Sequence, residues 1–315
     1  MNRKAIIFGI KGTSLTAAEK NILKTEIPWG IILFSRNIKD IFQLKNLVDS
    51  IKRITRDRSY PILIDQEGGS VSRLNKIIDL SLFSQNYFGK LYENDKKRFL
   101  DYYKIYIHRV CDILKYIGIN INTVPVLDIR RKNTHKVISN RCFHSNPNVV
   151  SKIGKFCIDL YNKNKIATVI KHIPGHGLSK YDSHHQLPII KSKKKELIKK
   201  DFRPFKKCKS FFAMTAHVIY STYDPIYTAT HSRIIINEVI RKHIGFKGIL
   251  ISDDISMKAL KYGLIDNATK ALNAGCNLIM HCNGNIKEMT QLTKFIPKID
   301  KFTQKKTSHF INFIG

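Results

Sequence analysis

The 315-residue chain lacks the features that define several protein classes. Its six cysteines include no C-x-x-C pair, which argues against a disulfide scaffold or a structural zinc site and predicts reduced, mostly buried thiols. No apolar run approaches the ~18 residues of a membrane-spanning helix. The apolar run from Ala5 to Ile10 is too short for a signal peptide, and we expect a buried strand there. These absences predict a cytoplasmic protein without a membrane partner.

Acidic residues are also scarce. The chain has 55 Lys and Arg against 24 Asp and Glu, which gives a formal net charge of +31. Such an excess suggests an anionic partner, either nucleic acid, an acidic membrane or an acidic substrate. At 43% hydrophobic residues the chain can nevertheless build a core, so wholesale disorder is excluded. Its length suits two ordinary domains or one large α/β barrel.

Short apolar runs recur along the chain and are separated by segments with helix signals. Each run is apolar almost throughout, as expected of parallel strands that are buried on both faces. The predicted strands are Ala5–Ile10, Gly30–Phe34, Pro61–Ile64, Ile121–Leu127, Ile166–Ile170, Phe212–Thr215, Gly248–Ile251 and Asn277–Met280. Strands alternating with helices in this number predict an α/β fold, a (β/α)8 TIM barrel, with a doubly wound sheet as the alternative. No linker divides residues 1–315, so we expect a single domain.

The helix signals between these runs are specific. Thr16 and Glu19 have the spacing of a capping box, in which each side chain satisfies a free main-chain N–H of the first turn. An apolar stripe at alternating steps of three and four residues predicts a helix that ends before Gly118. The stripe consists of Leu100, Tyr103, Ile107, Val110 and Leu114.

Unusual polar residues follow five successive predicted strands. They are Asp65–Arg73, then Asp128 with Asn140–Phe143, then Lys171–Gly177 with Asp182–His185, then Thr215–His217, and finally Ser252–Asp254. Any one of them has an ordinary structural explanation, such as a helix cap or a buried histidine. In a barrel, however, all would face one crevice at the carboxyl ends of the strands, where barrel enzymes carry their chemistry. Their coincidence therefore predicts an active site.

The residue types at these positions suit the cleavage of a glycosidic bond. That reaction needs one group to attack or stabilise the anomeric carbon and one acid to protonate the leaving oxygen. Asp253 directly follows a buried strand and is the candidate nucleophile, whereas Asp254 points away from it and is expected to cap the next helix. His184 is the candidate acid/base because imidazole titrates near pH ~6.5, with Asp182 holding one ring nitrogen.

Four motifs in this order resemble the bacterial β-N-acetylhexosaminidases of glycoside hydrolase family 3. They are Ile-Asp-Gln-Glu-Gly-Gly, Lys-His-x-Pro-Gly-His-Gly followed by Asp-Ser-His, Met-Thr-Ala-His-Val, and Gly-Phe-x-Gly-x-x-x-Ser-Asp-Asp-x-Ser-Met. The resemblance extends from the first strand to about Asn283. Residues 284–315 match poorly and are expected to form a helical tail with a packing role only.

The resemblance implies a barrel that removes terminal N-acetylglucosamine with retention, through a covalent glycosyl-enzyme intermediate. The implied substrate is a small carbohydrate of the muropeptide type, GlcNAc-1,6-anhydroMurNAc with or without peptide, recycled from the cell wall in the cytoplasm. We expect a monomer that needs no cofactor. Asp253 matches the family's nucleophile, and His184 with Asp182 matches its acid/base pair. The implied sugar-binding residues are Asp65, Arg73, Arg141, Lys171 and His172.

The sequence departs from the family pattern at the expected sugar-binding rim. Ser70 stands where the family often has Arg, and Arg141 is followed by Cys142-Phe143-His144 where Ser or Ala and then Phe-Gly is commoner. These changes bear on the fit of the sugar, whereas the proposed catalytic trio is intact.

A metal-dependent barrel hydrolase is one alternative, because histidines are plentiful. They are His172, His176, His184, His185 and His217. Such hydrolases commonly need a His-x-His pair after the first strand, where this chain has Gly9-Ile10-Lys11-Gly12. A Pro-Gly loop also would not present two histidines on one helical face. We therefore expect no metal.

A nucleic-acid-binding protein is a second alternative, supported by ten Lys and Arg residues between Lys191 and Lys209, with Phe202 and Phe205 among them. We favour a solvated helix whose phenylalanines face the barrel, and therefore no nucleic-acid partner. Phosphorolysis by the same trio remains open, because a neutral histidine repels phosphate less than a carboxylate does. The charge then mainly reflects composition, with a smaller part attracting the carboxylates of wall fragments.

Overall fold

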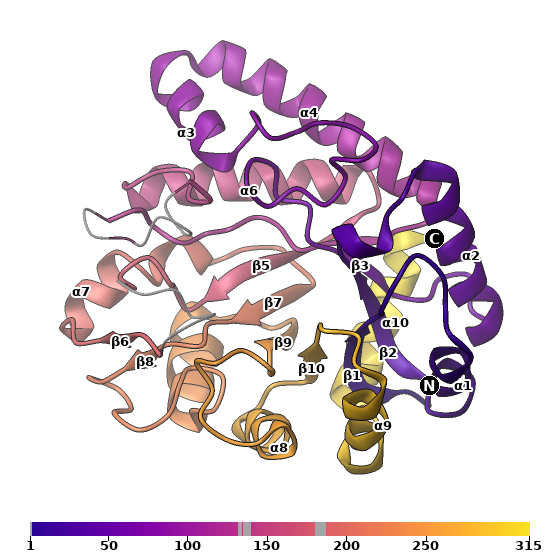
Figure 1. Ribbon diagram of the computed structural model, residues 1–315. Helices are drawn as coiled ribbons and strands as arrows, with labels where there is room; N and C mark the ends of the chain where they lie inside the picture. Colours follow the sequence, from indigo (N-terminus) through magenta and orange to yellow (C-terminus); the bar gives the residue numbers. More distant parts are fainter. Residues whose placement is uncertain (1, 132–133, 135–139, 180–186) are drawn as a thin grey trace.

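A computed structural model describes residues 2–131, 134, 140–179 and 187–315 (Figure 1). Eight parallel strands close into a barrel in the order β1-β10-β9-β7-β5-β4-β3-β2. Their bounds are β1 Lys4–Gly9, β2 Pro28–Leu33, β3 Ile62–Ile64, β4 Ile121–Asn122, β5 Ala167–Ile173, β7 Phe212–Thr215, β9 Ile249–Asp254 and β10 Leu278–His281. The closed order confirms the predicted (β/α)8 barrel, and the doubly wound alternative is wrong.

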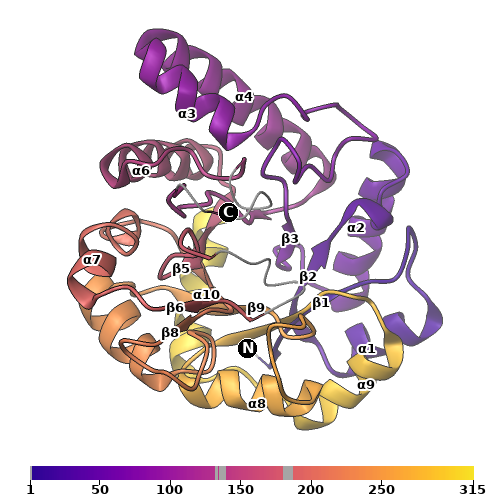
Figure 2. The same ribbon diagram turned by 60° about the vertical axis from the view of Figure 1, so that its left-hand side comes forward.

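Helices connect the strands and surround the barrel (Figures 1 and 2). They are α1 Ala17–Thr25, α2 Ile41–Thr55, α3 Gln85–Asn94, α4 Lys96–Ile117, α6 Pro147–Lys163, α7 Lys194–Lys199, a π-type helix over Ile235–Ile244, α8 Leu264–Ala274, α9 Ile286–Phe295 and α10 Lys301–Ile314. Short 3₁₀ turns cover Ser35–Asn37 and Arg203–Phe205. No helix in the described ranges has the length and apolar character to cross a membrane.

The strand predictions are confirmed except in the fourth run. There the strand β4 ends at Asn122, and a single bridge between Val126 and Lys171 resumes the pairing with β5. Pro125 lies between these two points and has no N–H to donate, which accounts for the interruption. A two-stranded sheet of β6 (Ile189–Ile190) and β8 (Ile219–Tyr220) lies outside the barrel and was not predicted.

The predicted capping box is present at the start of α1. The main-chain N–H of Glu19 donates to the Thr16 hydroxyl over 3.2 Å, and the N–H of Thr16 donates to the Glu19 carboxylate over 2.8 Å. The helix α4 also ends as predicted, at Gly118 with a φ of 93°. Its apolar stripe differs at one end, because Leu100 is 47% exposed and Phe99 takes the buried position.

The helix α10 closes the amino-terminal end of the barrel. Its residue Phe310 is buried against Phe212, the first residue of β7, with ring centroids 5.3 Å apart. The Trp29 indole of β2 donates a hydrogen bond to the Thr307 hydroxyl over 2.9 Å. The helix α10 therefore contributes to the core, because its aromatic residues pack against the amino-terminal ends of the strands.

Two further predictions concern buried side chains. Phe202 and Phe205 are fully buried in the core, as expected for phenylalanines that face the barrel. All six cysteines are free, and four of them are buried. The aromatic rings of the lysine-rich stretch are thus packed inside the protein, where they cannot stack on bases.

Candidate active site

The carboxyl ends of β3, β5 and β9 hold the predicted site residues. Asp65 directly follows β3, Lys171 and His172 lie in β5, and Asp253 lies in β9. The strands of the barrel are parallel, so these residues lie at one end of it. Lys171 and His172 are buried, whereas Asp65 and Asp253 are partly exposed. The partly exposed carboxylates are therefore the groups that a substrate can reach.

The Asp65 carboxylate is held by a fixed set of donors. Lys171 and Thr123 both donate to its Oδ1, and Arg73 donates to its Oδ2 over 2.8 Å. Burial alone would raise the pKa of Asp65, but the charges of Lys171 and Arg73 outweigh it and lower the pKa well below its usual range. Asp65 therefore stays ionised, and its exposed edge can accept hydrogen bonds from hydroxyl groups.

A buried ion-pair network lies behind Asp65. The Arg141 guanidinium makes two parallel hydrogen bonds to the Glu67 carboxylate, each 2.8 Å long. The Lys171 ammonium lies 2.5 Å from the same carboxylate and joins it to Asp65. Although burial opposes ionisation, Arg141 and Lys171 lower the pKa of Glu67. The network fixes the position of the Lys171 ammonium, and Lys171 in turn fixes the Asp65 carboxylate to which it donates.

The His172 side chain contacts a second buried carboxylate. Its Nδ1 lies 2.7 Å from the Asp128 carboxylate, which also accepts the main-chain N–H of His176 over 2.6 Å. Burial would raise the pKa of Asp128, but His172 counteracts it and the net pKa is lowered. With Nδ1–H donating to Asp128, the His172 Nε2 is left to accept from Arg141, whose Nη2 is 3.5 Å away.

Asp253 lies near the end of β9, beside a buried histidine. The main-chain N–H of Asp254 donates to the Asp253 carboxylate over 2.8 Å. Burial lowers the pKa of His217, and the nearby charge of Asp253, which raises it, has the smaller effect. Burial and the charges of Asp254, Asp253 and Asp65 all raise the pKa of the Cys282 thiol.

The expectation that Asp254 caps the next helix is wrong. The helix α8 begins at Leu264 after Gly263, and a turn region separates it from β9. The Asp254 carboxylate instead accepts hydrogen bonds from the main-chain N–H groups of Ser256 and Cys282, over 3.1 and 3.3 Å. It therefore ties the end of β9 to β10 and supports the segment that carries Asp253.

His184 and Asp182, the predicted acid/base pair, lie outside the described residues. Among the described residues, no group of three His, Cys, Asp or Glu side chains is arranged to hold a metal ion. The family departures Cys142 and Phe143 are buried in the protein, and the His144 Nε2 lies 3.3 Å from Glu93.

Sequence reasoning missed several residues of the site. Glu67 and Asp128 stood in the polar segments after the third and fourth strands, but only the structure shows their pairing with Arg141 and His172. Thr123 gave no signal, since threonine is common at the end of a strand. Charge balance offered a clue for Glu67, because buried cations such as Lys171 and Arg141 need carboxylate partners.

Acid is expected to destabilise the protein in two stages. Burial lowers the pKa of His176 and of His231 to about 4, so between pH ~6.5 and 4 the unfolded chain binds more protons than the folded one. Each histidine should then contribute a loss on the order of 3 kcal/mol across that window. Below pH ~4, protonation of the paired carboxylates adds a further loss. Urea denaturation at several pH values measures both stages.

A control variant for this expectation is His231→Gln. Its side chain can still donate to the Asn267 carbonyl, which accepts from the His231 Nε2 over 3.0 Å, but it does not titrate. The free energy of unfolding should then fall less steeply with pH, by about 1.4 kcal/mol per pH unit where one proton is lost. An identical slope in the variant would contradict a role for His231.

Comparison with known families identifies the fold and its chemistry. Residues 7–309 match the glycosyl hydrolase family 3 N terminal domain. The chain belongs to this family. The family 3 match continues beyond Asn283 into α10, and it agrees with the carboxylate-rich rim. The protein is therefore a glycosidase.

Two bacterial proteins and one bacterial structure illustrate what this family 3 chain is similar to. It is 34% identical over 287 residues to a Beta-hexosaminidase of Psychromonas ingrahamii, covering 89% of this chain and 83% of that protein. A Beta-hexosaminidase of Nitrosospira multiformis is 31% identical over 292 residues, covering 90% and 81%. The structure of NagZ from Neisseria gonorrhoeae in complex with N-trifluoroacetyl-D-glucosamine has a TM-score of 0.85 at 29% identity, covering 98% of this chain and 90% of that one.

Proposed function

We propose that this family 3 glycosidase, of the β-N-acetylhexosaminidase type, releases terminal N-acetylglucosamine from GlcNAc-1,6-anhydroMurNAc and its peptide-bearing forms. One observation carries the proposal: a partly exposed Asp253 shares the rim of the barrel with an Asp65 carboxylate that Lys171 and Arg73 hold. The names of the relatives support a hexosaminide as substrate, and the bound ligand of the Neisseria structure supports an N-acylated glucosamine.

The proposed reaction proceeds in two steps with net retention. In the first, the Asp253 carboxylate forms a bond to the anomeric carbon while the glycosidic C–O bond breaks. His184 gives its proton to the leaving oxygen, and Asp182 stabilises the imidazolium before that transfer. In the second, His184 takes a proton from water as the water attacks the anomeric carbon, which frees Asp253 and releases the sugar.

The remaining predicted residues hold the sugar in this proposal. Asp65 accepts hydrogen bonds from two sugar hydroxyls, because its charge is fixed and one edge is open. Arg73 is partly exposed and donates beside it. Lys171, Arg141 and His172 are buried, so they act at the inner end of the site or by holding Asp65 in place.

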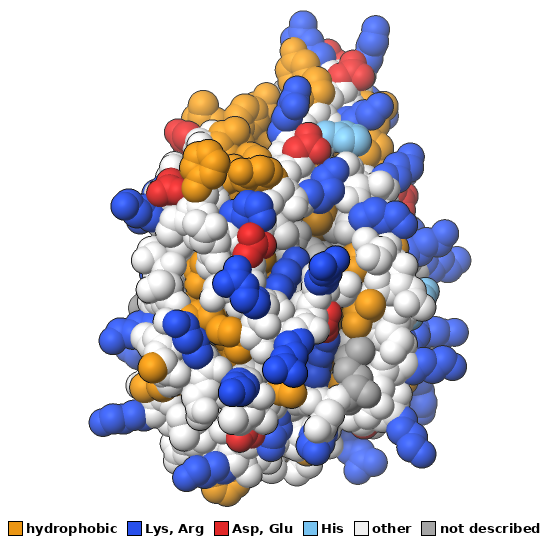
Figure 3. All heavy atoms as spheres, turned by 90° about the vertical axis from the view of Figure 1, so that its right-hand side faces the viewer, with side chains coloured by type: hydrophobic (Ala, Val, Ile, Leu, Met, Phe, Trp, Pro, Cys, Tyr) orange, Lys and Arg blue, Asp and Glu red, His pale blue; other side chains and the backbone are white. Residues whose placement is uncertain are grey.

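In this proposal the protein is a monomer that recycles cell-wall fragments in the cytoplasm. An anionic substrate of this kind would account for part of the protein's positive charge. Such fragments carry carboxylates, and Figure 3 shows lysine and arginine side chains spread over one face of the protein. A positive field raises the local concentration of an anionic substrate and its rate of encounter. The effect would weaken as salt is added, because ions screen the field over about 10 Å at 0.1 M.

The substrate assignment is tested with matched aryl glycosides. Purified protein without added metal should release the aryl group from an aryl N-acetyl-β-glucosaminide, and much more slowly from the corresponding glucoside. The same rates with and without phosphate, and free N-acetylglucosamine as the product, would indicate hydrolysis. A sugar 1-phosphate as the main product would replace hydrolysis by phosphorolysis. Equal rates on glucoside and N-acetylglucosaminide would contradict the proposal.

A further inference from the structure

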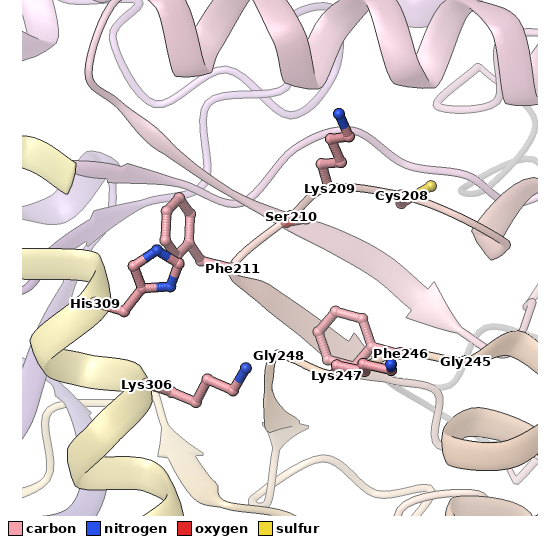
Figure 4. Close-up of a pocket in the computed structure, with 10 residues that line it drawn as sticks. All are labelled: Cys208, Lys209, Ser210, Phe211, Gly245, Phe246, Lys247, Gly248, Lys306 and His309. Carbon is pink, nitrogen blue, oxygen red and sulfur yellow. The ribbon is translucent and has the colours of Figure 1, made fainter.

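A cavity of about 340 Å³ lies at the amino-terminal end of the barrel, opposite the candidate active site (Figure 4). Its walls come from the segment before β7, the turn before β9 and the helix α10. The lining residues are Cys208, Lys209, Ser210, Phe211, Gly245, Phe246, Lys247, Gly248, Lys306 and His309. Gly248 precedes β9, and Asp253 lies five residues further along it, about 16 Å away at the rise of a strand. A molecule in the cavity therefore cannot touch Asp253.

The lining of the cavity carries positive charge only. Three lysines line it, whereas no aspartate or glutamate does. In the part of the chain that the structure describes, these lysines make no ion pair. Lys306 extends from α10 toward Gly248, while Lys209 points away from Lys306 (Figure 4). The Lys306 ammonium also lies 5.6 Å from the centre of the Phe302 ring, but no carboxylate neutralises it. Ammonium groups without a carboxylate partner around a hollow favour an anion, and lysine binds phosphate as a point charge.

The cavity also has aromatic walls. The rings of Phe211 and His309 lie side by side, with centroids 5.4 Å apart. Phe246, which is only 5% exposed, forms another part of the lining, and its ring lies 5.6 Å from the Arg241 guanidinium. Apolar ring faces next to cations suit a ligand that has both a charged group and a ring.

We propose that this cavity binds a phosphate monoester, whose phosphate contacts Lys247 and Lys306 and whose ring packs against Phe246. The two negative charges of the phosphate match the two lysines. Small-molecule sites usually occupy about 300–1,000 Å³, so the volume suits a compound of roughly monosaccharide size. Such binding is independent of the glycosidase reaction, and it gives a role to charge that the active site does not use.

Thermal unfolding with inorganic phosphate and with phenyl phosphate tests the proposal, with sodium chloride keeping the ionic strength constant. Both should raise the Tm, by about 4 °C at about 100 times the Kd. Phenyl phosphate should bind more tightly because its ring adds contacts with Phe246. Calorimetric titration should show a loss of at least about tenfold in affinity for the double variant Lys247→Ala, Lys306→Ala.

The matched control is the double variant Lys301→Ala, Lys305→Ala. It removes the same charge from exposed positions of α10 that do not line the cavity, and it should bind as the wild type does. Equal losses in both double variants would indicate diffuse attraction and overturn the proposal. So would full binding after Lys247 and Lys306 are replaced, since the phosphate would then lie elsewhere, for example in the active site. Tighter binding of a single-stranded oligonucleotide than of phenyl phosphate would also overturn it.

Discussion

Asp253→Asn is expected to lower the rate of N-acetylglucosaminide hydrolysis by at least about 1,000-fold. The amide has nearly the shape of the carboxylate but carries no charge, so it can neither attack the anomeric carbon nor stabilise the positive charge that develops there. Initial rates with an aryl N-acetyl-β-glucosaminide measure the loss. The Tm should change little, because Asp253 is partly exposed and its carboxylate accepts the N–H of Asp254, which an amide oxygen can also do.

Two further variants separate the role of Asp253 from that of the acid. His184→Ala should slow substrates with poor leaving groups most, since those depend on protonation, and should spare a dinitrophenyl leaving group. Asp253→Ala should stay slow with every leaving group, but added azide should restore turnover by attacking the anomeric carbon from the vacated side. Undiminished hydrolysis by Asp253→Asn would contradict the nucleophile assignment, whatever the result with His184.

The barrel itself could be predicted because its signals are local. Each buried strand is a short apolar run, and the capping box at Thr16 fixes a helix start within four residues of sequence. The fourth strand was predicted too long because residues 121–127 are apolar almost throughout, and only the geometry shows that pairing stops at Asn122. Likewise, the sequence alone allows the apolar stripe of α4 to begin at Leu100 or at Phe99. The structure shows that Phe99 is buried and that Leu100 is exposed.

The site could be predicted only as a collection of residues. Position after a strand places Asp65 and Asp253 at one end of a barrel, which the structure bears out. The ion-pair and hydrogen-bond partners of the site residues could not be predicted in this way, because they depend on contacts between residues that are distant in sequence. Glu67 lies 74 residues from Arg141, and although charge balance indicates that a carboxylate is needed, no local pattern identifies which one pairs with Arg141. For the same reason, Asp254 was expected to be a helix cap, although its partner Cys282, which directly follows β10, lies 28 residues away in the sequence.

Glu67→Gln is expected to have the largest effect on stability. Glu67 is buried and shared between Arg141 and Lys171, so the substitution removes the carboxylate that pairs with both buried cations. Removing one partner of a buried ion pair typically costs about 3–5 kcal/mol, because the remaining charge is desolvated without compensation. Urea denaturation at pH 7 measures this change. Activity should fall as well, since Lys171 also holds Asp65.

The matched control is Glu238→Gln, which breaks an ion pair of the same length in the opposite setting. The Lys242 ammonium lies 2.8 Å from the Glu238 carboxylate on the surface of the π-type helix, where both side chains are more than half exposed. Water solvates both charges there, so the loss should stay below about 1 kcal/mol. Similar losses in the two variants would contradict the buried network as a source of stability. A large loss for Glu67→Gln alone would instead show that burial, rather than distance, gives this ion pair its weight.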